Sequence, residues 1–275
     1  MFPNDEEEQD RLDMLHHIFL LVQDGQLYTA PIEDPKRVLD MGAGTGIWAL
    51  HFADQFPDAE VIGIDHDPMQ PNWVPPNCRF IVDNLEDEWA YPPHQKFDYI
   101  HQRSMCGSIA DWTRLYQQAM QHLQPGGWLE IQEFEVWFSS QKPGGLPDDS
   151  AIVQWQGLID EGSTKFGRRL SYAGSFHKHL EEAGFEDIQA RRFKTPIGSW
   201  PADRKLKSIG VFLQAQMMDA LDAVTYVYFT RALGWTQDET RVLLAQVRKE
   251  FSDRSLHLYT YCWFYTARKP MSKTG

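Results

Sequence analysis

The chain has 275 residues and a formal net charge of −13, with 26 lysine and arginine residues against 39 aspartate and glutamate residues. This length allows a full hydrophobic core in one large domain, and the acidic balance argues against a nucleic-acid partner, because affinity for the phosphate backbone rests on clustered lysine and arginine. No apolar run in the sequence is long enough to span a membrane, the three cysteines form no CxxC pair, and the acidic start is unlike a signal peptide, so we expect a cytoplasmic protein with no membrane partner and no metal.

The first predicted element is an amphipathic helix over residues 3–22. Asn4 can cap its first turn, and acidic residues follow where they face the positive end of the helix dipole. Leu12 and Phe19 lie on one apolar face at helical spacing, and Gly25 marks the end of the segment.

From residue 37 to residue 138, short apolar strands alternate with helical segments. Predicted strands cover residues 37–41, 59–65, 78–84, 97–102 and 128–138. Predicted helices cover residues 46–56 and about 112–123, and the second helix ends in the turn sequence QPGG. This alternation is typical of an α/β fold, in which helices cover both faces of a mostly parallel sheet.

The second half of the chain is mostly helical. A helix capped by Ser175 and stopped at Gly184 leads into a strand near residues 188–193. The remaining predicted elements are helices at about 204–221 and, after a capping box of Thr236 and Glu239, at 238–251, and a closing strand at 257–268. These helices are too many for a simple crossover between two strands, so we interpret them as a helical cap.

The strand at 37–41 runs into a glycine-rich loop within the sequence VLDMGAGTGIWAL. Glycines at positions 42, 44 and 46 let backbone amides approach a ligand closely, because no side chain stands in between. In an open α/β sheet, the ligand binds at the carboxyl ends of the strands, where this loop lies.

The spacing of these glycines helps to distinguish between two possible nucleotide ligands. The dinucleotide fingerprint is G-x-G-x-x-G, whereas this chain has G-x-G-x-G preceded by Asp40. A carboxylate there would repel a pyrophosphate but suits the ammonium and sulfonium groups of S-adenosylmethionine. Asp65 ends the second strand, where it can bind ribose hydroxyls, and Asp83 and Asn84 follow the third strand, where an adenine edge would lie. We therefore expect S-adenosyl-L-methionine as the cofactor rather than NAD.

Through Asp40-x-Gly42-x-Gly44-x-Gly46, Asp65 and Asp83, the chain resembles the class I, Rossmann-like methyltransferases. More closely, it resembles the fungal LaeA-like and trans-aconitate methyltransferase-like group, through NDEEEQDRLDMLHHIFLL, FDYIHQRSM, LQPGGWLEIQE and the closing ARKP. The resemblance implies a seven-stranded sheet whose last strand runs antiparallel between the fifth and the sixth. It also implies one methyltransferase domain over residues 1–275, made of a helix at 1–30 that closes the site, a cofactor-binding core at 36–140, and cap insertions at about 147–172 and 200–252.

By the same resemblance, the cofactor is bound by the glycine loop and by the ends of the neighbouring strands. The cofactor-binding residues implied in this way are Asp40, Gly42, Ala43, Gly44, Thr45, Gly46, Asp65, His66, Asp83, Asn84, Leu85 and His101.

Methyl transfer depends on alignment of the acceptor, and it needs a general base only if the acceptor holds its proton near neutral pH. His101, at the end of the fourth strand, can orient the cofactor or accept a proton, and Arg103 can hold an acidic acceptor with two hydrogen bonds. Equally, His101 can simply pack in the core and Arg103 can form a surface ion pair. Glu133, near the end of the fifth strand, is a further candidate, although a capping or surface role would explain it as well.

An acceptor pocket can draw on aromatic, cationic and flexible side chains. The candidates for substrate binding are Tyr28, Trp48, Arg103, Trp137 and Met217, although the aromatic residues and Met217 can equally serve the core. The pairs His16–His17 and His177–His179 are rejected as metal sites, because such close neighbours on a helix point apart.

These observations predict a small-molecule methyltransferase of secondary metabolism that acts on oxygen, and on a carboxylate if Arg103 holds the acceptor. The alternative is a LaeA-like regulator that binds the cofactor and a protein partner, in the cytoplasm or the nucleus. A nicotinamide-dependent oxidoreductase is disfavoured by the glycine spacing. The acceptor's identity and the oligomeric state stay open.

Overall fold

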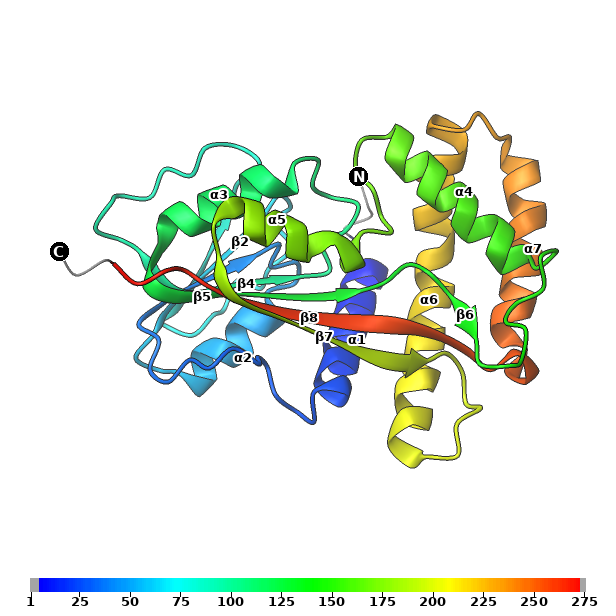
Figure 1. Cartoon of the computed structure of the whole chain (residues 1–275), viewed down its shortest axis with the longest axis horizontal. Helices are drawn as coiled ribbons and strands as arrows, with labels where there is room; N and C mark the ends of the chain where they lie inside the picture. The colour runs from blue at the N-terminus through cyan, green and yellow to red at the C-terminus, as the bar shows by residue number, and fades with distance from the viewer. Residues whose placement is uncertain (1–4, 273–275) are drawn as a thin grey trace.

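The computed structural model describes residues 5–272 as an α/β fold around one mixed sheet (Figure 1). The helices are α1 (Glu6–Val22), α2 (Ile47–Gln55), α3 (Trp112–His122), α4 (Ala151–Lys165), α5 (Phe176–Ala183), α6 (Arg204–Arg231) and α7 (Gln237–Ser252). The strands are β1 (Arg37–Met41), β2 (Glu60–Asp65), β3 (Cys78–Val82), β4 (Phe97–Arg103), β5 (Leu123–Phe134), β6 (Ser139–Ser140), β7 (Glu186–Pro196) and β8 (Leu258–Arg268). Short 3-10 turns lie at Ala173–Ser175 and Arg254–Leu256.

The strand order is β3-β2-β1-β4-β5-β8, and β7 pairs with β8. The pairs among β1 to β5 are parallel, and β8 runs antiparallel between β5 and β7. This confirms the expected arrangement of seven strands, and the two-residue β6 adds an eighth strand on β8. The strand order reverses between β1 and β4, so the topological switch point lies where these two strands end.

The turn predicted at QPGG lies inside β5 rather than before it. The register of β5 on β4 shifts between Phe97 and Tyr99, so the residues in between form a bulge. Gly126 has a φ of +81° in this bulge, and its N–H donates to the carbonyl of Lys269 (3.0 Å).

Two helices differ from the prediction at their ends. α1 is capped by Asp5, whereas the predicted cap Asn4 lies outside the described residues. α6 continues past residue 221 to Arg231, because its apolar face continues and the first helix breaker is Gly234.

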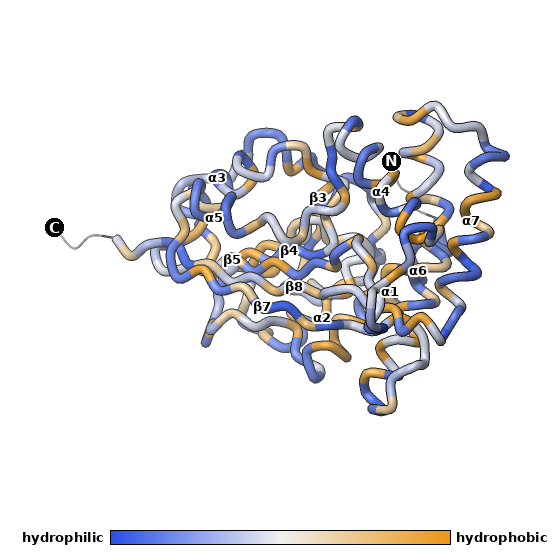
Figure 2. Tube along the Cα trace, turned by 45° about the vertical axis from the view of Figure 1, so that its right-hand side comes forward, coloured by the Kyte–Doolittle hydropathy of each residue, from blue (hydrophilic) through white to orange (hydrophobic). Residues whose placement is uncertain are grey.

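The helices form layers around the sheet and a bundle beside it. α3 and α5 pack together over β5, β7 and β8, and α2 packs against β2 and β3 (Figure 1). α6 packs against α1, α4 and α7, beyond the sheet edge at which the parallel strands end (Figure 1). Figure 2 shows apolar segments gathered at the central strands β4 and β5, where Ile100 and Ile131 are fully buried. Across residues 5–272, every helix is too short or too polar to serve as a transmembrane span.

Candidate functional site

A cavity of about 560 Å³ lies at the carboxyl ends of the parallel strands and extends to α6. The segments that follow β1, β2, β3, β4 and β5 all contribute to its wall. Residues of α1 line it beside the glycine loop, and residues of α4 and α6 line it beyond the strand ends. This is the switch point of the sheet, where open α/β folds bind their ligands.

Most of the predicted cofactor residues line this cavity. They are Gly42, Ala43, Gly44, Thr45, Asp65, His66, Asp83, Asn84 and Leu85. The sheet brings these distant parts of the sequence together, because parallel neighbouring strands end at the same edge. Asp40, Gly46 and His101 do not line the cavity, and Gly46 lies behind the loop against the ring of Phe80.

The glycine loop needs glycine for two different reasons. Gly42 has a φ of +69° and Gly44 a φ of +56°, a conformation that strains residues with a side chain. A Cβ at Gly42 would also stand 2.9 Å from the Cγ and Sδ atoms of Met105, which is too close for a real contact. A Cβ at Gly44 would make only an ordinary contact with Leu12 of α1, at 3.5 Å. Gly44 is therefore required for its backbone conformation, and Gly42 for its packing as well.

Asp65 holds the glycine loop in place. Its Oδ2 atom accepts a hydrogen bond from the N–H of Gly44 (2.7 Å), and its Oδ1 atom accepts one from the N–H of Asp67 (3.1 Å). The side-chain amide of Gln70 donates to the carbonyl of Gly44 (2.6 Å). The carboxylate predicted to bind ribose thus also fixes the loop beside it, while it remains part of the cavity wall.

Asp40 and His101 form a buried pair beneath the glycine loop. The Nδ1 atom of His101 lies 2.7 Å from Oδ1 of Asp40, and the two residues are register partners on β1 and β4. The His101 ring stacks on Trp48 with the centroids 3.6 Å apart. Because this packing encloses the ring, the structure does not place His101 where it could take a proton from an acceptor. The position of His101 agrees with the alternative expectation, in which this residue simply packs in the core.

Three predicted substrate residues lie elsewhere. Trp48 is buried on α2, and its indole N–H donates to the carbonyl of Leu27 (3.0 Å). Tyr28 packs against Phe52, and Trp137 is exposed to solvent. The expectation that Tyr28, Trp48 and Trp137 line the pocket is therefore not met, because two of them pack with the core around α2 and the third faces outward.

Arg103 and Met217, in contrast, line the cavity. The guanidinium carbon of Arg103 lies 5.1 Å from the ring centroid of Phe19 in α1. Burial lowers the pKa of Arg103 to about 10, and the nearby carboxylates of Asp40 and Asp13 act in the opposite direction. Arg103 is therefore a cation at neutral pH, and among residues 5–272 it has no hydrogen bond or ion pair, which excludes the surface ion pair considered above.

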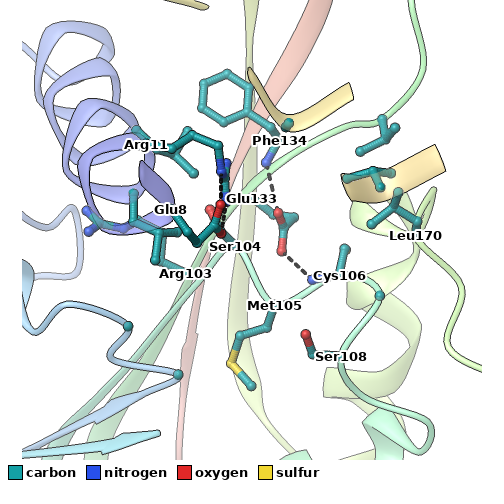
Figure 3. A pocket seen from close by; sticks show the side chains of 18 of the residues that line it. Glu8, Arg11, Arg103, Ser104, Met105, Cys106, Ser108, Glu133, Phe134 and Leu170 are labelled. Atoms are coloured by element: carbon teal, nitrogen blue, oxygen red, sulfur yellow. Dashed lines mark hydrogen bonds and ion pairs between the residues drawn. The ribbon is translucent and has the colours of Figure 1, made fainter. Parts of the chain in front are cut away.

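Glu133, at the end of β5, is a buried carboxylate in the cavity wall (Figure 3). Its Oε2 atom accepts a hydrogen bond from the N–H of Cys106 (3.0 Å), and its Oε1 atom accepts one from the N–H of Phe134 (3.2 Å). Burial raises the pKa of Glu133 to about 7, and the hydrogen bonds from Cys106 and Phe134 offset this only in part. A group with such a pKa can both accept and return a proton at neutral pH.

The cavity also has an apolar wall, which the sequence analysis missed apart from Met217. This apolar wall consists of Phe134, Val136, Phe138, Trp155, Leu170, Leu213, Met217, Ala220, Leu221 and Val224. The α6 members recur at helical spacing, but the same spacing is typical of a core-facing helix. The sequence therefore gave no signal that this face borders a cavity.

α1 lies over the glycine loop and adds polar residues to the cavity. Glu8 and Arg11 of α1 line it and pair with each other, with 2.6 Å between Nε of Arg11 and Oε2 of Glu8. The hydroxyl of Thr45, in the glycine loop, donates to Oδ1 of Asp13 (2.7 Å).

The residues at this end of the cavity suit an adenosyl-sulfonium ligand. The loop at Gly44 carries no side chain, and Asp65 and Asp83 provide carboxylate acceptors for hydroxyl groups. Arg103, which has no ion-pair partner among the described residues, provides a cation for a carboxylate.

Comparison with known proteins shows the family to which the chain belongs. A family model described as a methyltransferase domain matches residues 14–190. The chain is 43% identical over 273 residues to methyltransferase pytC of Aspergillus terreus, covering 98% of this chain and 83% of pytC. It is 36% identical over 277 residues to the secondary metabolism regulator LAE1 of Cochliobolus heterostrophus, covering 98% of this chain and 90% of LAE1. Coclaurine N-methyltransferase, bound to N-methylheliamine and S-adenosylhomocysteine, shares the fold with a TM-score of 0.51 at 14% identity, covering 93% of this chain and 70% of that one. The chain belongs to the methyltransferase domain family and is an S-adenosylmethionine-dependent methyltransferase.

Proposed function

We propose that this methyltransferase transfers the methyl group to an oxygen atom of a small molecule of secondary metabolism. The observation that carries the proposal is one continuous cavity, which has the glycine loop and Asp65 at one end and the apolar wall at the other. Two small ligands can meet in such a cavity without contact with bulk water. The relatives named as methyltransferase pytC and as secondary metabolism regulators support the metabolic setting.

In this proposal the donor lies at the glycine-loop end. Asp65 and Asp83 accept hydrogen bonds from its hydroxyl groups, and Arg103 pairs with its carboxylate. Asn84 and Leu85 border the adenine. The buried pair of Asp40 and His101 acts from behind by fixing the ends of β1 and β4, rather than by touching the ligand.

S-adenosylmethionine supplies an electrophilic methyl group when it is bound. The chain's own task is to hold the acceptor in line and to exclude water, and orientation of this kind is worth on the order of 7–11 kcal/mol. The apolar wall excludes water on the acceptor side. We assign closure of the donor side to α1, and the role of a cap over the acceptor to α4 and α6.

Two kinds of oxygen acceptor are compatible with methyl transfer. A carboxylate needs a cation to hold it and no base. Arg103 is the cation of the cavity wall without a partner among residues 5–272, so such an acceptor would share Arg103 with the donor's carboxylate. A hydroxyl group needs a base, and Glu133 is the carboxylate placed for that task.

The donor site is tested by isothermal titration calorimetry with S-adenosylhomocysteine. We expect the parent protein to bind, and Asp65→Ala to bind about 10–100-fold more weakly, because a charged hydrogen-bond partner is lost. Glu60→Gln, at the opposite end of β2, is the matched control and should bind like the parent. Absence of binding by the parent would overturn the assignment of the donor site.

The acceptor atom is tested by mass spectrometry with a donor that carries a deuterated methyl group. Phenols, enols, carboxylic acids, amines and thiols are offered together. Label on oxygen supports the proposal, and label only on nitrogen or sulfur would overturn it.

The identity of 36% with LAE1, a protein named as a regulator, favours one second candidate function. The chain would then bind the donor and a protein partner without turnover of small molecules. Tight binding of S-adenosylhomocysteine, no methylated product from any acceptor class, and a stable complex with a partner protein would together support this candidate.

A further inference from the structure

We propose that the acceptor is an uncharged, mainly apolar molecule with a weakly acidic hydroxyl group, such as a phenol or an enol, and that the Glu133 carboxylate removes the proton of that hydroxyl. This inference rests on the proposed methyl transfer to oxygen and specifies the substrate class of the same site.

The two charged candidates for acceptor binding lie in different parts of the cavity. In Figure 3, Arg103 lies toward α1, whereas the Glu133 carboxylate is joined by dashed lines to Cys106 and Phe134. The Arg103 guanidinium packs on Phe19 of α1 and is close enough to Asp13 and Asp40 for their charges to affect its pKa. Arg103 pairs in register with Gln132 of β5, so the side chains of Arg103 and Glu133 point to opposite faces of the sheet. Glu133 is therefore the ionisable group on the Cys106 side of the cavity, and Arg103 lies on the side of α1.

The other cations that line the cavity are already paired. Arg11 binds Glu8 with 2.6 Å between Nε and Oε2, and Arg168 pairs with Glu86 and with the carbonyl of Ser108. Near Glu133, the carboxylate of Glu135 accepts a hydrogen bond from the indole of Trp263 (3.0 Å). An anionic acceptor beside Glu133 would thus face two carboxylates, while Arg103, the cation of the cavity wall without a partner among residues 5–272, points to the other face of the sheet, which disfavours a carboxylic acid there.

The groups that face Glu133 from the neighbouring elements are uncharged. They are the thiol of Cys106 after β4, the phenol of Tyr116 on α3 and the thiol of Cys262 on β8. Burial raises the pKa of each of these three groups, and the charge of Glu133 raises it further. Glu133 is therefore a carboxylate without a cationic partner, and burial raises its pKa to about 7. Such a group matches the proton affinity of a weakly acidic hydroxyl far better than an ordinary carboxylate does.

The step balances without any further reactant. Glu133 takes the hydroxyl proton, and an oxygen electron pair of the acceptor forms the new bond to the methyl carbon. The bond between that carbon and the donor sulfur breaks, and its electron pair stays on sulfur. The products are a methyl ether, S-adenosylhomocysteine and protonated Glu133, which returns its proton to solvent.

The test compares Glu133→Gln with the parent on two acceptors of similar size at about pH 8, phenol and 4-nitrophenol. Gln keeps the shape of the side chain and one acceptor oxygen for the N–H of Cys106. We expect the variant to lose about 10²–10⁴-fold in kcat/KM on phenol, which keeps its proton, and less than tenfold on 4-nitrophenol, which is already ionised. Equal losses on both acceptors would show a purely structural role and would overturn the inference. Glu135→Gln is the matched control and should not change the ratio between the two acceptors.

A binding measurement separates this inference from the proposed function. Phenol and benzoate are titrated into the complex of the parent protein with S-adenosylhomocysteine, and into the same complex of Glu133→Gln. We expect the parent to bind phenol and to bind benzoate at least tenfold more weakly, and the variant to gain affinity for benzoate. Benzoate that binds the parent as tightly as phenol, or is methylated in preference to it, would overturn the inference and leave O-methylation intact. No binding of S-adenosylhomocysteine at all would instead contradict the donor site.

Discussion

The hydroxyl of Thr45 in the glycine loop donates a hydrogen bond of 2.7 Å to the carboxylate of Asp13 in α1. This contact ties the N-terminal helix directly to the loop at the end of β1. Leu12, the neighbour of Asp13, also reaches the loop, since its side chain would lie 3.5 Å from a Cβ at Gly44. This contact supports the proposal that α1 closes the donor side of the cavity, and we expect its release to open that side.

The first prediction concerns this contact. Asp13→Ala removes the hydrogen bond from Thr45 while leaving the cavity wall unchanged, since Asp13 is exposed and does not line it. We expect a loss of about 0.5–1.5 kcal/mol in donor affinity, expressed mainly as faster release. Stopped-flow measurement of S-adenosylhomocysteine dissociation checks this. Asp10→Ala, an exposed acid on the same helix, is the control, and equal release rates in the two variants would contradict a closing role for α1.

The second prediction concerns the buried pair beneath the loop. His101→Ala leaves the carboxylate of Asp40 buried without its partner, so we expect a loss of about 3–5 kcal/mol in the free energy of unfolding. His101→Asn can still donate to Asp40 and should lose less. Urea denaturation measures both variants.

The same variants decide the catalytic role of His101. The ring of His101 lies outside the cavity. We therefore expect the pH profile of kcat/KM to have the same shape in His101→Asn as in the parent protein, even if the maximal value of kcat/KM falls. Disappearance of one limb of the profile would show that His101 titrates in the reaction.

The third prediction separates backbone strain from packing in the glycine loop. Gly42 and Gly144 both have a positive φ, +69° and +88°, but a Cβ at Gly144 would meet nothing within 4 Å. We expect each change to alanine to cost about 1–2 kcal/mol in unfolding free energy through conformation alone. Gly42→Ala should lose more, and should also weaken binding of S-adenosylhomocysteine, because Met105 in the cavity wall must move. Identical effects of the two substitutions, measured by denaturation and calorimetry, would contradict this account.

The part of the site that follows directly from the sequence is the part set by strand ends. A parallel strand fixes where its last residue lies, so Asp65 and Asp83 could be assigned to one edge of the sheet before any contact was known. The spacing of the glycines predicted that the loop after the neighbouring strand β1 approaches a ligand through its backbone. The antiparallel position of the last strand between the fifth and the sixth followed from the family resemblance, and the structure confirms it.

The rest of the site depends on tertiary packing that leaves no local signal. The side of α6 that borders the cavity has the same apolar spacing as a core-facing helix, so Met217 could be named only as a candidate and its neighbours in the cavity wall could not be named. Trp48 fits a pocket and a core equally well by composition, and here it packs on His101. Glu133 could be named as a candidate general base, but the sequence could not show that it is a better candidate than His101. The raised pKa of Glu133 comes from burial by segments that are distant in the sequence.

The fourth prediction is a pH dependence of stability that arises from Glu133. Burial raises the pKa of Glu133 from 4.5 to about 7, so between these values the folded protein holds a proton that the unfolded chain has released. Stability from this group is fully present below the lower value and is lost as the pH rises through the higher one, with a total change of about 3 kcal/mol. Glu133→Gln removes the titration, so the free energy of unfolding of the variant relative to the parent should rise by up to about 3 kcal/mol between about pH 5 and about pH 8. Urea denaturation at both pH values, with Glu135→Gln as the control, measures this difference. A difference that stays constant with pH would mean that Glu133 ionises in the folded protein as it does in the unfolded chain, and burial would then not be tuning this carboxylate for proton transfer.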